Sequence, residues 1–102
     1  MASFARVAPA ADVPLETKRA FEVGGRTILV CHAPERWYAV SNLCSHANEK
    51  LECGRMSRGR ISCPVHGARF DLATGRALNA PATQPIATFE VRVVDDWIEV
   101  LV

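Results

Sequence analysis

Two short pairs of metal-ligating side chains stand out in this chain. The first is Cys44-Ser45-His46 and the second is Cys63-Pro64-Val65-His66, with sixteen residues between them. Thiolates and imidazoles bind zinc and iron–sulfur centres, and such close spacing lets both members of a pair reach one site from a single loop. The pattern therefore predicts a site held by two cysteines and two histidines.

The order of the ligands separates two kinds of metal site. Structural zinc sites usually pair cysteine with cysteine and histidine with histidine. Here each pair contains one cysteine and one histidine. This mixture favours a two-iron centre, with both thiolates on one iron and both imidazoles on the other. A zinc-binding module remains the alternative.

Short runs of β-branched and aromatic residues between turn signals predict an all-β fold around these loops. Gly24-Gly25 and Asp95-Asp96 are expected as hairpin turns, whereas 47–53 could form a single helical turn. We expect one domain over 1–102, a small antiparallel β-sandwich or barrel with the two ligand loops at one end. The expected strands cover residues 3–8, 19–23, 26–32, 36–42, 68–73, 86–94 and 97–102.

The ligand pairs and their surroundings resemble the Rieske [2Fe–2S] family. WYAVSNLCSHA resembles the run into the first cluster loop, ISCPVHGARFDLATGRAL the second loop, and APATQPIATFEVRVV the proline-bearing third loop. The resemblance implies cluster-binding loops at about 43–50 and 62–70, a proline loop at about 79–85, and one Rieske cluster. By resemblance, Cys44 and Cys63 hold the inner iron, while His46 and His66 hold the outer, more exposed iron.

Departures from the high-potential members of the family indicate a low reduction potential. Those members join the two loops by a disulfide at the positions of Glu49 and Val65, so that disulfide cannot form here. They also carry hydroxyl donors to the cluster sulfurs where this chain has Ala68 and Phe70. Such hydrogen bonds stabilise the reduced state, so their loss implies a potential at the low end of the Rieske range, around −150 mV.

The resemblance implies an electron carrier and no enzyme activity of its own. Apart from the ligand pairs only His32 remains, so the histidines of a mononuclear iron site are missing. We expect a ferredoxin that shuttles single electrons from a flavin-containing ferredoxin reductase to a terminal ring-hydroxylating oxygenase of aromatic hydrocarbon catabolism. The alternative of the same fold is the small Rieske subunit of an assimilatory nitrite reductase.

Composition and charge limit the other partners. The net charge is +1, and the basic residues are not interleaved with aromatic ones, so nucleic acid is not an expected partner. No apolar run is long enough to span a membrane, and the N-terminal residues lack a signal-peptide pattern. We therefore expect a cytoplasmic monomer that docks transiently. Residues 44–76 contain six basic and three acidic side chains, which favours acidic partners.

The remaining cysteines, His32 and the aromatic residues are expected to have structural roles and not to be cluster ligands. Cys31 is expected to be a buried, inert thiol, and His32 a strand residue with at most one hydrogen bond. Cys53 is interpreted as a partly buried loop residue, and packing is expected for the aromatic residues Trp37, Tyr38 and Trp97. Gly67 is expected to permit close approach of the backbone to the cluster, and Pro81 to shape the third loop. Leu43 and Pro64 are expected to shield the cluster from solvent.

Overall fold

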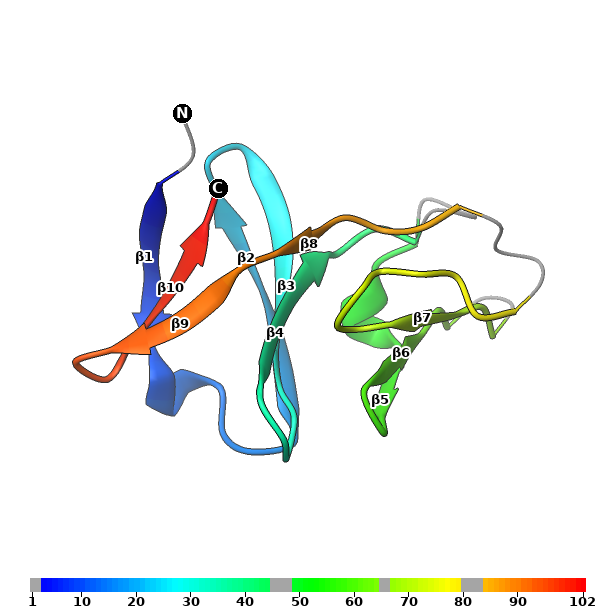
Figure 1. Cartoon of the computed structure of the whole chain (residues 1–102), viewed down its shortest axis with the longest axis horizontal. Helices are drawn as coiled ribbons and strands as arrows, with labels where there is room; N and C mark the ends of the chain where they lie inside the picture. Colours follow the sequence, from blue (N-terminus) through cyan, green and yellow to red (C-terminus); the bar gives the residue numbers. More distant parts are fainter. Residues whose placement is uncertain (1–2, 45–48, 65–66, 80–83) are drawn as a thin grey trace.

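The computed structural model describes residues 3–44, 49–64, 67–79 and 84–102. Within these ranges the chain forms three antiparallel sheets and two short 3₁₀ turns (Figure 1). The expected all-β fold is confirmed. In chain order the elements are β1 (Phe4–Pro9), η1 (Ala10–Asp12), β2 (Thr17–Val23), β3 (Arg26–His32), β4 (Trp37–Ser41), η2 (Leu51–Cys53), β5 (Arg55–Ser57), β6 (Arg60–Ser62), β7 (Arg69–Asp71), β8 (Thr88–Phe89), β9 (Val91–Val94) and β10 (Trp97–Leu101).

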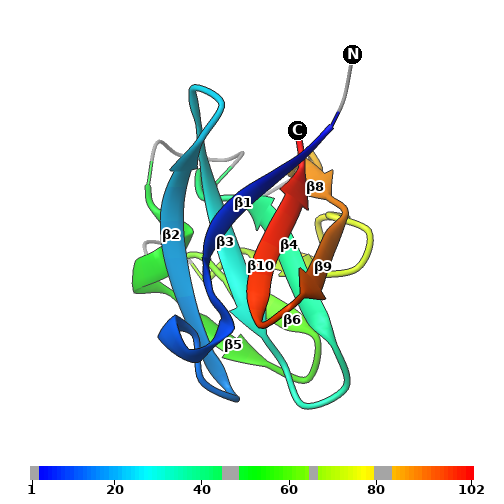
Figure 2. The ribbon, with the colours of Figure 1, turned by 90° about the vertical axis from the view of Figure 1, so that its left-hand side faces the viewer.

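The central sheet β2-β3-β4-β8 lies between the other two sheets, β1-β10-β9 and β5-β6-β7. Because successive side chains of a strand point to opposite faces, β3 supplies both cores. Ile28 and Val30 pack with Ile98 against the outer sheet β1-β10-β9. Leu29 and Cys31 pack in the other core, which extends to β6 and β7. Figures 1 and 2 show this arrangement, with β3 and β4 in the middle.

The predicted hairpin turns are present and have the backbone geometry that the right-handed strand twist requires. Gly24 and Gly25 both have positive φ, 58° and 80°, and connect β2 to β3. Asp95 and Asp96 also have positive φ, 51° and 64°, and connect β9 to β10. Aspartate tolerates this left-handed conformation better than most residues, so the turn forms without a glycine.

Two features of the sheets differ from the expectation. The hairpin of β5 and β6, with Arg58-Gly59 as its turn, was not predicted, because each strand is three residues long with one apolar side chain. The run 86–94 forms two strands, with β8 paired to β4 and β9 paired to β10. This segment passes from the central sheet to the outer one, which a periodic pattern does not reveal.

The aromatic side chains are packed less uniformly than expected. Tyr38 is buried in the core and Trp37 is half-buried. The expectation was wrong for Trp97, which is 36% exposed and lies beneath the Arg6 guanidinium at 5.2 Å. In the part of the chain that the structure describes, no helix is long and apolar enough to cross a membrane.

Candidate metal centre

The first ligand loop is closed by backbone contacts on both sides of its cysteine. It leaves the end of β4, and an isolated antiparallel bridge joins Leu43 to Lys50. Inside that bridge the Cys44 N–H donates to the Glu49 carbonyl at 2.9 Å. The loop therefore returns to its starting point within a few residues, and Cys44 occupies its base.

The second ligand loop connects β6 to β7 and is closed in the same way. Ser62 pairs with Arg69 across the two strands, and the Cys63 N–H donates to the Ala68 carbonyl at 2.6 Å. In both loops the cysteine amide thus bonds to the carbonyl five residues later. The Gly67 N–H returns to the Cys63 carbonyl at 3.2 Å, and its φ of 69° is a conformation that glycine adopts at no steric cost.

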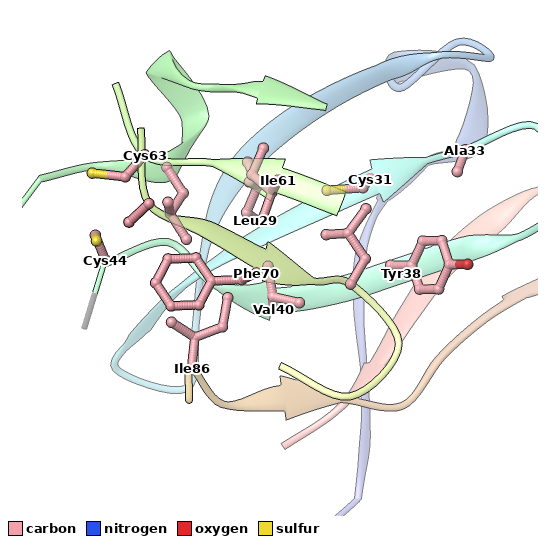
Figure 3. Close-up of a cluster of buried hydrophobic side chains, with 13 residues drawn as sticks. Leu29, Cys31, Ala33, Tyr38, Val40, Cys44, Ile61, Cys63, Phe70 and Ile86 are labelled. Atoms are coloured by element: carbon pink, nitrogen blue, oxygen red, sulfur yellow. The ribbon is translucent and has the colours of Figure 1, made fainter. Parts of the chain in front are cut away.

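The two cysteines lie at one end of the same apolar core. Cys44 is 4% exposed and Cys63 is 2% exposed, and neither is in a disulfide. Figure 3 shows both cysteine side chains at one edge of the cluster, which also contains Phe70 and Ile86. Two buried sulfur donors from two matched loops fit the sulfur half of a Rieske ligand set.

The other two predicted ligands, His46 and His66, lie outside the described residues, as do Val65 and Pro81. Their assignment stays a prediction. Leu43 is 48% exposed and Pro64 is exposed, so both lie at the surface beside the cysteines.

A buried asparagine anchors the first loop and was missed in the sequence. Asn42 is fully buried, and its side chain exchanges two hydrogen bonds with Glu52, accepting from the backbone N–H at 2.9 Å and donating to Oε1 at 3.1 Å. Its backbone carbonyl accepts from the Leu51 N–H at 2.7 Å. The only sequence signal for this role was the position of Asn42, a polar residue between a largely apolar strand and the ligand pair.

A second asparagine connects the second loop to the segment after β7. Asn79 Oδ1 accepts from the Arg69 N–H at 2.7 Å, and Nδ2 donates to the Gly67 carbonyl at 3.2 Å. The Leu78 N–H also donates to the Arg69 carbonyl at 2.8 Å. These bonds hold the start of the predicted proline loop against the ligand loop.

The remaining cysteines and His32, which were not predicted as ligands, differ from Cys44 and Cys63 in position or exposure. Cys31 is fully buried as predicted, and burial raises the pKa of its thiol to about 12 while Lys18 partly opposes the shift. Cys53 is exposed in η2, so the prediction of partial burial was wrong. His32 Nδ1 lies 3.0 Å from the Val13 carbonyl, the single hydrogen bond expected, and its ring stacks on Trp37 at 3.8 Å.

Strand register places His32 far from the ligand loops. In the β3–β4 pair His32 is opposite Trp37, whereas Ile28 at the other end is opposite Ser41, from which the first loop departs. His32 therefore lies at the opposite end of this strand pair from the start of the first ligand loop.

Comparisons with known proteins agree with this geometry. The sequence profile of the Rieske [2Fe-2S] domain matches residues 3–90. The chain belongs to the Rieske [2Fe–2S] family. The ferredoxin component of the naphthalene 1,2-dioxygenase system of Pseudomonas putida is 38% identical over 71 residues, which are 70% of this chain and 68% of that protein.

Solved Rieske ferredoxins match over nearly the whole chain. The ferredoxin of carbazole 1,9a-dioxygenase from Nocardioides aromaticivorans IC177 has a TM-score of 0.90 and 34% identity, covering 96% of both chains. A ferredoxin in complex with the oxygenase of carbazole 1,9a-dioxygenase has a TM-score of 0.86 and 31% identity, covering 95% of this chain and 91% of that one. Structures described as nitrite reductase small subunits also match, but at 16% and 18% identity they show the fold alone.

The family and its cofactor, one Rieske [2Fe–2S] cluster, are as the sequence predicted. The protein is a Rieske ferredoxin of the kind found in ring-hydroxylating dioxygenase systems, an electron carrier and not itself the oxygenase.

Proposed function

We propose that this ferredoxin accepts single electrons from a flavin-containing reductase and delivers them to a terminal ring-hydroxylating oxygenase. The observation that carries the proposal is the pair of buried thiols, Cys44 and Cys63, at one end of an apolar core in two equally closed loops. The likeness to a ferredoxin solved in complex with an oxygenase supports the choice of acceptor.

The thiolates of Cys44 and Cys63 and the imidazoles of His46 and His66 would hold the cluster. When bound, the [2Fe–2S] group supplies a site that gains or loses one electron without a chemical change in the protein. The two cysteines share a buried apolar cluster with Leu51, Phe70 and Ile86, and the loop closures hold the cysteine backbones in place.

Several finer properties belong to the same proposal. Residues 1–102 form one Rieske domain, a monomer that docks transiently in the cytoplasm, with no nucleic acid or membrane among its partners. Its potential is at the low end of the Rieske range, because Ala68 and Phe70 carry no hydroxyl. A nitrite reductase subunit would share the fold but work in a permanent complex, and a zinc module would hold no iron.

The first test is the metal content and spectrum of anaerobically purified protein. We expect about two irons and two acid-labile sulfides per chain, a rhombic EPR signal after reduction, and a potential of around −150 mV. A single zinc without iron would refute the electron-carrier role. A positive potential would refute only the low-potential assignment. Purification of the protein as part of a permanent complex would favour the nitrite reductase subunit.

The cysteines offer a matched pair of variants for the ligand assignment. Cys63→Ser removes a predicted ligand from the buried position, and we expect loss of the cluster and of the EPR signal. Cys53→Ser makes the same replacement of sulfur by oxygen at an exposed position in η2, and we expect the iron content to stay unchanged. Equal iron content in both variants would contradict the assignment of Cys63.

A further inference from the structure

The sheet β5-β6-β7 has one apolar face and one strongly basic face. Met56, Ile61 and Phe70 share the face that packs into the core. By the alternation of strand side chains, the opposite face carries two cross-strand rows. These rows are Arg55, Ser62 and Arg69, and then Ser57, Arg60 and Asp71.

This face is hollowed and surrounded by guanidinium groups. A hollow of about 340 Å³ is lined by Arg55, Ser57, Arg58, Arg60, Ser62 and Arg69, and we call these residues the basic face. All four arginines are exposed. A serine separates Arg55 from Arg69 within their row, so like charges are not directly opposite one another.

Little acidic charge neutralises the basic face. The Asp71 carboxylate accepts hydrogen bonds from the backbone of Ala73 and Thr74, at 2.8 and 3.1 Å. Among the described residues the ion pairs are those of Glu99 with Arg6 and Arg92, on the outer sheet. The guanidinium groups of the basic face are therefore available to an external anion.

The basic face lies directly beside the second ligand loop. Ser62 immediately precedes Cys63, and Arg69 begins β7 immediately after the Cys63–Ala68 loop closure. Figure 1 shows the sheet at the end of the molecule that carries the ligand loops. A molecule bound on this face would therefore sit close to the cluster site, which a redox partner requires and an unrelated ligand does not.

We propose that the basic face is a docking surface for a carboxylate-rich patch on a redox partner protein. This inference rests on the proposed function, since it takes the bound protein to be an electron donor or acceptor. Arginine suits the role because its planar fork can bind a carboxylate through two hydrogen bonds. Nucleic acid is the less suitable anion, because among the described residues no aromatic side chain lines the hollow to stack a base.

The test compares two double variants of equal net charge in the cluster-containing protein. Arg60→Gln/Arg69→Gln removes two charges from the basic face. Arg19→Gln/Arg26→Gln removes two exposed charges from β2 and β3 and serves as the control. Fluorescence anisotropy at low ionic strength measures binding of a labelled oligoglutamate peptide and of a labelled single-stranded DNA of the same charge.

We expect the basic-face variant to bind oligoglutamate about tenfold more weakly, while the control binds within about twofold of the unchanged protein. In stopped-flow experiments, the same variant should transfer electrons more slowly to anionic ferricyanide and faster to cationic hexaamminecobalt(III), relative to the control. Added salt should reduce these differences.

The outcomes separate this inference from the proposed function. Equal weakening in both double variants, or DNA bound more tightly than oligoglutamate through the basic face, would overturn the docking surface. Neither result affects the cluster, which the EPR signal of the same samples reports independently. A missing EPR signal in the unchanged protein would instead refute the proposed function, whatever the peptide binds.

Discussion

At the residue scale, position distinguishes the four cysteines more clearly than chemistry does. Cys31 lies in the middle of the core between two paired strands, so its thiol is shielded from water and from the ligand loops. Cys44 and Cys63 lie at the edge of the same core, where the chain opens into loops (Figure 3). Burial raises the pKa of the Cys31 thiol, whereas Cys44 and Cys63 are suited to be ligands by their position at the base of two loops.

The raised pKa of Cys31 predicts a loss of stability at alkaline pH. Burial raises that pKa from 9.0 to about 12, so the folded state disfavours the thiolate. The contribution of this shift to the free energy of unfolding is fully present below pH 9. It is lost as the pH rises toward 12, by up to about 1.4 kcal/mol per pH unit. Denaturant titrations at several pH values would measure this slope.

Cys31→Ala removes the titrating group and serves as the comparison. We expect it to cost about 1 kcal/mol at neutral pH through the small cavity, but to flatten the decline above pH 9. Burial also raises the pKa of Tyr38. The unchanged protein and the Cys31→Ala variant should therefore share a further loss of stability at alkaline pH. Parallel pH curves for the two proteins would show that Cys31 is not the group responsible.

At the element scale, a close backbone contact joins the two ligand loops. Gly54 lies between η2, which follows the first loop, and β5. A Cβ atom at Gly54 would overlap the carbonyl oxygen of Ser62, the residue before Cys63. Its backbone has an ordinary φ of −84°, so the need for glycine comes from this contact and not from conformation.

Gly54→Ala should therefore disturb both stability and cluster content. We expect a loss of about 2–3 kcal/mol, because backbone atoms cannot move aside as a flexible side chain can. Gly25→Ala is the matched control, since a Cβ there meets nothing within 4 Å and only the positive φ opposes it, for about 1–2 kcal/mol. Denaturant unfolding and iron content check both effects. A Gly54→Ala protein with full iron content would contradict the proposed link between the loops.

At the scale of the whole molecule, the three sheets share two cores that depend on the ligand loops to different extents. Cys44 and Cys63 belong to the core between the central sheet and β5-β6-β7. The core between the central sheet and β1-β10-β9 contains neither cysteine. Metal binding should therefore stabilise one side of the molecule more than the other.

Removing the metal should loosen β5-β6-β7 before the rest. After chelation of the iron, we expect amide hydrogen exchange in β5, β6 and β7 to increase at least about tenfold, because loop ordering and metal binding are coupled. The amides of β1, β3 and β10 should change much less. Uniform loss of protection across all three sheets would show that the two cores unfold as one unit.

The sequence alone determined the parts of the protein that depend on local chemistry. Cysteine and histidine at close spacing identify an iron–sulfur motif wherever the loops lie, and Gly24-Gly25 specifies a hairpin because few other residues adopt those angles. The long strands were predictable because their alternating side chains reflect two buried or half-buried faces, as in β3 and β10.

Only the tertiary structure decided the contacts that depend on distant segments. The strands β5 and β6 have one apolar residue each. They are stabilised by pairing with each other, by the pairing of β6 with β7, and by packing on the central sheet. The anchoring role of Asn42 and the close contact of Gly54 with Ser62 also require partners that local sequence cannot identify. The same holds for the basic face, because strand pairing brings Arg55 and Arg69 onto one surface although fourteen positions separate them in the chain.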